Sequence, residues 1–203
     1  MRYILVILLS YLIGSISFGI IVTRLVKGED IRKYGSGNTG FTNVLRVVGT
    51  GPALFVIAGD AFKGAICVIL GSYIGGNMYC AVLGGLVAMA GHTYPLYHGF
   101  RGGKGVATGL GVTLTLAPDV TLIAIAVFAV SVLLSRYVSL GSILGAFSVP
   151  LSICILGKQV PILLFGILAA LFVVYRHKSN IIRIYKGEEN KIGKKTDNDG
   201  GIL

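Results

Sequence analysis

Three short polar segments in an otherwise apolar chain carry side chains that suit the binding of an anion. They are "YGSGNTGFTNVLR" at residues 34–46, "HTYPLYHGFRGGKGVATG" at 92–109 and "YRHKSNIIRIYKGEENK" at 175–191. Glycine backbones, hydroxyls, amides and cations supply the donors that bind phosphate or carboxylate oxygens. The segments therefore indicate chemistry that works by positioning and by charge neutralisation.

The first segment matches G-x-G-x-x-G at Gly35, Gly37 and Gly40. A dinucleotide site would need a preceding strand, whereas the polar "KGEDIRKY" precedes it and an apolar run follows, so that interpretation is disfavoured. A plain glycine-rich turn is the alternative. Against it stand the donors gathered within a dozen residues, which are Ser36, Asn38, Thr39, Thr42, Asn43 and Arg46. Thr42, Asn43 and Arg46 share a face if "FTNVLRVV" forms a short interfacial helix.

The second segment approaches the Walker A pattern but fails it at His98 and at Gly105, so a nucleotide triphosphatase is disfavoured. Gly102, Gly103 and Lys104 lead directly into an apolar run. A glycine loop that opens a helix directs N–H groups and the positive end of the helix at an anion, and Lys104 adds a full charge. We therefore expect the two glycine amides to face phosphate, with an ordinary basic loop as the alternative.

The third segment follows the last apolar run. If that helix continues past Tyr175, then His177, Asn180 and Ile184 lie on one face, and Gly187 is placed to end the helix. A plain basic flank explains the cations of this segment. It does not explain the pairing of His177 with Asn180.

Apolar runs must position these segments, because 54% of the 203 residues are hydrophobic and only 13% are charged. Runs of about 20 apolar residues span a bilayer as helices, and their continuous rather than alternating pattern excludes a barrel. We predict an all-α, polytopic membrane protein with a bundle of seven transmembrane helices. The expected spans are 3–23, 52–74, 77–92, 105–117, 120–135, 138–157 and 160–175. The first lacks the cleavage site of a signal peptide.

The net charge of +10 follows the predicted topology. Fifteen of the 18 basic residues fall on one side of the predicted spans, the side that also carries all three polar segments. The positive-inside rule places the amino terminus outside and the carboxyl terminus in the cytoplasm. No nucleic-acid partner is expected. The polar tail 193–203 is predicted to be disordered and cytoplasmic.

Residues inside the apolar runs allow three further expectations. Asp60 and Lys63 stand three apart on one predicted helix, which indicates a structural ion pair, with a role in transport as the alternative. The three cysteines lie in apolar runs without a histidine at ligand spacing, so no metal site is expected. Glycines four apart, such as Gly71 with Gly75 and Gly141 with Gly145, predict close helix packing.

The motifs "GSGNTGFTN", "GGKGVAT" and "NIIRIYKGEENK" together resemble those of the bacterial integral membrane acyl-phosphate:glycerol-3-phosphate acyltransferases, over residues 1–192. The resemblance implies one acyltransferase domain at 1–192 in the inner (cytoplasmic) membrane, with its site facing the cytoplasm. It implies transfer of a fatty acyl group from acyl phosphate to the 1-hydroxyl of glycerol 3-phosphate, the first acylation of phospholipid synthesis. The products are lysophosphatidic acid and phosphate, and no cofactor is implied. Membrane lipid is the remaining partner.

The resemblance also assigns site residues by motif. The catalytic residues it implies are Ser36, Arg46, Lys104, His177 and Asn180. The substrate- and phosphate-binding residues are Gly37, Asn38, Thr42, Asn43, Gly102, Gly103 and Glu189. Phe41 departs from the family pattern, which more usually has a small residue there.

The chemistry suits an acyl phosphate independently of the resemblance. The sequence contains neither the H-x-x-x-x-D motif of other glycerolipid acyltransferases nor G-x-S-x-G. Acyl phosphate is a mixed anhydride with a good leaving group, so positioning and charge stabilisation suffice for most of the rate. A phosphate or anion transporter is the alternative function, and a membrane scaffold would leave the polar segments unexplained. The sequence leaves open the acyl-chain preference, other donors and the oligomeric state, and it is compatible with a monomer.

Overall fold

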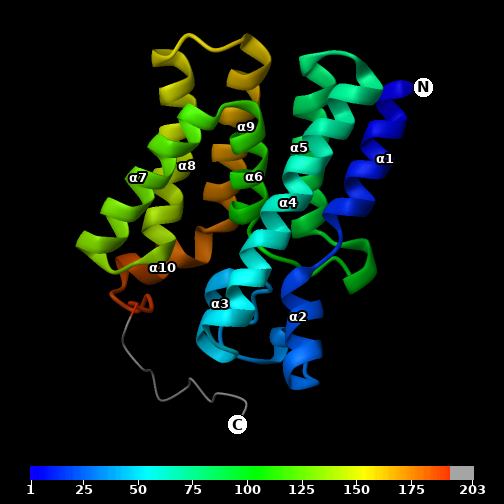
Figure 1. The fold of residues 1–203 in the computed structure, drawn as a ribbon. Helices are drawn as coiled ribbons and strands as arrows, with labels where there is room; N and C mark the ends of the chain where they lie inside the picture. Colours follow the sequence, from blue (N-terminus) through cyan, green and yellow to red (C-terminus); the bar gives the residue numbers. More distant parts are fainter. Residues whose placement is uncertain (193–203) are drawn as a thin grey trace. The chain divides into compact units, whose positions relative to one another are not determined.

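The computed structural model describes residues 1–192, and the predicted disordered tail 193–203 lies outside them. Within this part of the chain every regular element is helical, which confirms the all-α prediction (Figure 1). The chain divides into two compact units, residues 1–112 and residues 113–192. The first unit contains the first two polar segments, and the second unit contains the third.

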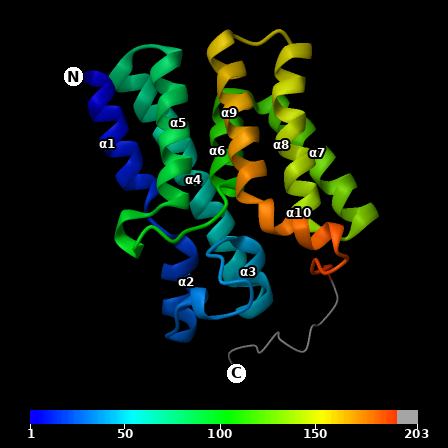
Figure 2. The ribbon, with the colours of Figure 1, turned by 180° about the vertical axis from the view of Figure 1, so that it is seen from behind.

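The first unit has three long apolar helices and a set of shorter ones. Its elements are α1 (Arg2–Gly14), α2 (Phe18–Lys27), η1 (Ile31–Lys33), α3 (Phe41–Val47), α4 (Thr50–Gly75), α5 (Met78–Thr93), η2 (Leu96–His98) and most of α6 (Val106–Leu116). In the second unit follow α7 (Pro118–Ser135), α8 (Val138–Ile155), α9 (Val160–Arg176) and α10 (Lys178–Tyr185). Figures 1 and 2 show α1, α4 and α5 side by side from opposite directions.

Each of the seven predicted apolar runs forms helix, but length alone identifies fewer membrane spans. Four segments are long and apolar enough to cross a bilayer, namely Arg2–Lys27, Thr50–Gly75, Pro118–Ser135 and Val138–Ile155. A fifth results if α9 and α10, which meet at a bend of 57°, count as one span. The remaining apolar helices, α5 with 16 residues and α6 with 11, are shorter than the roughly 20 residues that a bilayer crossing typically needs.

The first predicted span, 3–23, is not one continuous helix. The helix stops at Gly14 and restarts at Phe18, and Ser17 between them is extended. The break leaves the Ile16 carbonyl without a helical partner, and the Lys63 ammonium donates to it at 2.6 Å. Broken helices are tolerated at membrane depth where side chains satisfy the released backbone groups. The contact joins residues 47 positions apart, so local sequence does not reveal it.

α9 covers the last predicted run, 160–175, but does not continue straight into the third segment. α9 stops at Arg176, and His177 forms the corner before α10. The His177 backbone N–H donates to the carbonyls of Val173 and Val174, each at 3.0 Å. The expectation that His177 and Asn180 lie on one face of a single straight helix is therefore wrong.

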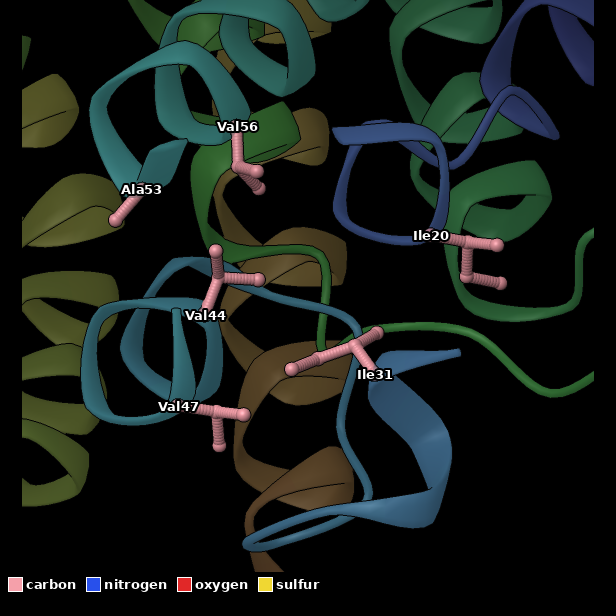
Figure 3. Packing of buried hydrophobic residues seen from close by; sticks show 6 residues of the cluster. All are labelled: Ile20, Ile31, Val44, Val47, Ala53 and Val56. Atoms are coloured by element: carbon pink, nitrogen blue, oxygen red, sulfur yellow. The ribbon is translucent and has the colours of Figure 1, made fainter. Parts of the chain in front are cut away.

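Glycines bring the helices close together, as their spacing predicts. A Cβ added at Gly71 would collide with the Cys80 carbonyl on the next helix, and one at Gly141 with the Val132 side chain. Beside the membrane helices, a buried apolar cluster joins α2, η1, α3 and the start of α4 (Figure 3). Its members are Ile20, Ile31, Val44, Val47, Ala53 and Val56. This cluster holds together the helices on either side of the first polar segment.

Candidate functional site

The first polar segment folds around the buried side chain of Asn43. The Asn43 Oδ1 accepts a hydrogen bond from the Ser36 N–H at 2.9 Å. Its Nδ2 donates to the carbonyls of Asn38 at 2.9 Å and Tyr34 at 3.0 Å, with Ile31 farther off at 3.4 Å. Both polar atoms of the side chain are thus used on the backbone of its own loop. Asn43 therefore shapes the loop, and its expected role in binding phosphate stays a prediction.

We expect Asn43→Ala to lower the thermal stability of the purified protein. Each buried backbone group left without its partner costs about 1–3 kcal/mol, and this substitution removes the partner of several at once. The measurement is the midpoint of thermal unfolding in detergent. Ser36→Ala is the matched control, because the exposed Ser36 contributes its backbone N–H to this network. An Asn43→Ala variant that unfolds at the parental temperature would contradict the assignment.

The remaining residues of the first segment are more open to solvent. Ser36 and Gly37 are exposed, and the Asn38 Oδ1 caps the turn by accepting from the Gly40 N–H at 2.9 Å. The predicted short helix is confirmed as α3, in which Thr42 and Arg46 are half-buried, one turn apart. Of the predicted donors in this segment, Ser36, Thr42 and Arg46 keep side chains at or near the surface.

In the second segment, the Gly102 and Gly103 amides make hydrogen bonds within the protein, and their expected role in binding phosphate stays a prediction. The Gly102 N–H donates to the Thr93 carbonyl at 3.1 Å, and the Gly103 N–H donates to the His92 carbonyl at 3.2 Å. Both amides are therefore used at the end of α5, where helix carbonyls lack partners within the helix. The half-buried Lys104 follows directly, and Gly105, with a φ of +82°, starts the turn into α6. The expected role of Lys104 in binding phosphate stays a prediction.

Arg32 joins the first two segments inside the first unit. Its Nη1 donates to the His98 carbonyl at 2.7 Å, while Nε and Nη2 contact the two carboxylate oxygens of Asp30 at 3.0 and 2.8 Å. The Arg32 guanidinium holds the pKa of Asp30 well below its usual range. Burial, with the positive charges of Arg32 and Arg24, lowers the pKa of His98. Sequence reasoning missed this bidentate pair, whose signal is an acid two residues before a base.

In the third segment, Glu189 holds Asn180 in place. Glu189 Oε1 accepts from Asn180 Nδ2 at 2.6 Å and from Ser139 Oγ at 2.7 Å, and Oε2 pairs with Arg183 Nε at 2.7 Å. Burial raises the pKa of Glu189, but these donors outweigh it and leave the pKa below its ordinary value. The Glu189 oxygens are engaged by protein donors, and the expected role of Glu189 in binding substrate stays a prediction. Gly187, with a φ of +72°, ends α10 as predicted.

His177 is buried at the corner between α9 and α10. Its Nδ1 donates to the Val173 carbonyl at 2.8 Å, so in the neutral ring the lone pair lies on Nε2. Such a ring can accept a hydrogen bond from a hydroxyl group. His177 and the buried Asn180 lie in the second unit, whereas Ser36, Arg46 and Lys104 lie in the first.

The predicted ion pair in α4 is confirmed and is larger than expected. Lys63 Nζ lies 2.8 Å from Asp60 Oδ1, and the two side chains are 2% and 1% exposed. His92, at the end of α5, joins them with its Nδ1 2.9 Å from Lys63 Nζ. The sequence gives little sign of this third member, because a histidine at the end of an apolar run more often makes an isolated hydrogen bond.

Comparison with known proteins adds a family to these features. The family described as "Glycerol-3-phosphate acyltransferase" matches the chain over residues 4–187. The chain belongs to this family. Its acyltransferase relatives include a glycerol-3-phosphate acyltransferase of Desulforamulus reducens, 48% identical, with 95% of this chain and 96% of the relative covered. A second, from Synechococcus elongatus, is 44% identical with 93% of each covered. The resemblance drawn from the three motifs is thereby confirmed.

Solved structures agree with the sequence relatives. A crystal structure of PlsY, an integral membrane glycerol 3-phosphate acyltransferase, in its glycerol 3-phosphate form is similar with a TM-score of 0.90 and 38% identity. The match covers 95% of this chain and 96% of that one. The lysophosphatidic acid form gives a TM-score of 0.87 at 36% identity, with the same coverage. Like these relatives, the acyltransferase described here is an integral membrane protein.

Proposed function

We propose that the protein transfers a fatty acyl group from acyl phosphate to the 1-hydroxyl of glycerol 3-phosphate. The observation that carries the proposal is the likeness of nearly the whole chain to PlsY, solved in a glycerol 3-phosphate form and a lysophosphatidic acid form. These two molecules are the acceptor and the product of such a transfer. The acyl phosphate donor is what the family resemblance implies. The absence of H-x-x-x-x-D and G-x-S-x-G suits such a donor, because a mixed anhydride needs less activation than a thioester.

The proposed reaction is a single displacement without an acyl-enzyme. The hydroxyl oxygen of glycerol 3-phosphate attacks the acyl carbon, the bond from that carbon to the phosphate oxygen breaks, and phosphate leaves with the electron pair. The hydroxyl proton passes to a phosphate oxygen. Lys104, Arg46 and Ser36 neutralise and position phosphate oxygens, while His177 and Asn180 orient the acceptor. Asn43, Gly102, Gly103 and Glu189 support these residues through the contacts described above.

The function is tested by phosphate release from the purified protein in detergent. With palmitoyl phosphate as donor, we expect release that depends on glycerol 3-phosphate and is matched by lysophosphatidic acid formed. Glycerol in place of glycerol 3-phosphate is the control for the acceptor. Palmitoyl-CoA and palmitoyl-acyl carrier protein, each in place of palmitoyl phosphate, test the donor. No acyl transfer from any of the three donors would refute the proposed activity.

The transporter alternative is less well supported. A transporter would be expected to use the charged pair Asp60 and Lys63 in α4 as its ion site. These two side chains contact each other, and Lys63 also contacts the Ile16 carbonyl and His92. Such a closed set of contacts suits an anchor between helices better than a site that must release an ion. The family relationship points to the acyltransferase in the same way.

We also propose that the protein crosses the bacterial inner membrane seven times. The spans are the broken first helix and helices α4 to α9, with the amino terminus outside and the three polar segments at the cytoplasmic side. Single cysteines at Lys33, Phe100 and Lys186 are then expected to resist an impermeant thiol reagent in intact cells, whereas one at Asn77 reacts. The background carries Cys154→Ser, because Cys154 is the exposed native cysteine. Permeabilised cells should label all four positions, and labelling of the first three in intact cells would reverse the orientation.

A further inference from the structure

A buried cluster of three ionisable side chains lies directly behind the glycine loop of the second segment, and the proposed chemistry does not use it. Asp60 and Lys63 come from α4 and His92 from the end of α5, and all three are buried. Charges at such depth are costly unless neighbouring groups compensate them. The contacts of the cluster show how they are compensated and what the cluster holds in place.

The Lys63 ammonium fixes the orientation of the His92 ring. Nζ lies 2.8 Å from Asp60 Oδ1, 2.6 Å from the Ile16 carbonyl and 2.9 Å from His92 Nδ1. An ammonium has three N–H donors and no acceptor, so these three neighbours match its capacity. With Lys63 as an ammonium, which can only donate, His92 Nδ1 accepts from it and the neutral ring carries its proton on Nε2. The same Nδ1 lies 3.4 Å from Asp60 Oδ1. One lysine thus ties together α4, the break after α1 and the end of α5.

The other edge of the His92 ring and its carbonyl meet the glycine loop. The His92 carbonyl accepts from the Gly103 N–H at 3.2 Å. A Cβ added at Gly103 would overlap His92 Nε2, and one added at Gly102 would overlap the His92 carbonyl. The loop therefore runs in contact with His92 for the two residues before Lys104. A shift of the ring would move the backbone from which the Lys104 side chain extends.

We infer that His92 is a positioning residue for Lys104, held in register by Lys63 and Asp60. The cluster acts through the loop and does not touch the substrate. This inference rests on the proposed function, in which Lys104 binds phosphate. If it holds, a substitution at His92 moves Lys104 away from its phosphate and lowers kcat/KM for glycerol 3-phosphate or acyl phosphate.

The test uses His92→Asn in the full-length protein. Asparagine Oδ1 can replace Nδ1 as the acceptor for Lys63, so the charged pair stays compensated, but the part of the ring that contacts Gly103 is lost. We expect an unfolding midpoint close to that of the parent and a kcat/KM lowered by about 10- to 100-fold, the range of a misplaced positioning group. His98→Asn, the same substitution at the half-buried histidine of the same segment, is the control and should keep the parental kinetics.

A double-mutant cycle with Lys104→Ala separates positioning from a general loss of structure. If His92 acts through Lys104, adding His92→Asn to Lys104→Ala should change kcat/KM by less than about threefold. Gly103→Ala displaces the ring from the loop by the opposite route. It should therefore lower kcat/KM in the parent protein but leave kcat/KM unchanged in the Lys104→Ala background. This variant tests the same contact if His92→Asn does not fold.

Different results would refute the positioning role of His92 and the proposed acyl transfer. Full additivity in the double mutant, or parental kcat/KM for His92→Asn, overturns the positioning role while the parent still transfers acyl groups. Parental kcat/KM for Lys104→Ala overturns both the positioning role and the proposed role of Lys104. Absence of acyl transfer by the parent protein itself overturns the proposed function.

Discussion

Lys104→Ala and Arg46→Ala are each expected to lower kcat/KM by about 10²–10³, the loss associated with removing one preorganised electrostatic contact. Lys104 directly follows the loop that packs on His92, and Arg46 lies in the last turn of α3. The Gly102 and Gly103 amides donate to backbone carbonyls in the protein, so the prediction for this loop is made for the charge of Lys104. Steady-state kinetics with palmitoyl phosphate and glycerol 3-phosphate measure the effect.

The matched control for these two variants is Lys33→Ala. Lys33 is an exposed cation on the same side of the predicted spans, with a side chain that is 70% exposed and 3.5 Å from Glu29. Removing such a surface pair changes stability by about 0–1 kcal/mol, and no loss of activity is expected. Near-parental turnover of either test variant would remove that residue from the mechanism. A matching loss in Lys33→Ala would show that the assay reports general surface charge.

His177 is expected to orient the acceptor, with the proton passing to a phosphate oxygen of the donor. A general base typically contributes about 10²–10⁴ in rate, so the two roles predict different mutant series. His177→Asn keeps a donor for the Val173 carbonyl at the corner between α9 and α10 but cannot accept a proton near neutral pH. We therefore expect it to retain much more activity than His177→Ala, measured as kcat at saturating substrates.

The orientation of the ring makes this comparison informative. His177 Nδ1 is engaged by the Val173 carbonyl, so Nε2 is the nitrogen that would accept a proton from the substrate. If both variants lose turnover equally while glycerol 3-phosphate still binds, His177 is the base. Binding is measured separately, by the protection that glycerol 3-phosphate gives against thermal unfolding.

Properties set by local sequence were predictable. All seven apolar runs form helix, the first as the two helices α1 and α2. The segment that begins at Phe41 was predicted as the short helix α3, and Gly187 was correctly placed at the end of α10. The three motifs identified the family, because a run of specific side chains in a fixed order carries more information than composition does. The Asp60–Lys63 pair was also local, since residues three apart on a helix are neighbours.

Contacts between distant segments were not predictable. The break after Gly14 depends on Lys63, and the use of the Gly102 amide depends on a carbonyl that the end of α5 leaves unpaired. Asn43 and Glu189 were assigned to the substrate because their types suit it, but their hydrogen bonds go to the protein. A residue type that can bind a ligand can equally hold a loop, and only the fold decides which of the two occurs.

The spacing of Asp60 and Lys63 has a consequence for how α4 enters the membrane during synthesis. They are the charged residues of Thr50–Gly75, and at three residues apart they can meet as soon as that segment becomes helical. A lone charge at the centre of an inserting helix costs roughly 2.5–3.5 kcal/mol. The pair instead lets α4 pass from the translocation machinery into lipid with no net charge. His92 follows α4 in the chain, so it can contact Lys63 only later, once α5 has been inserted.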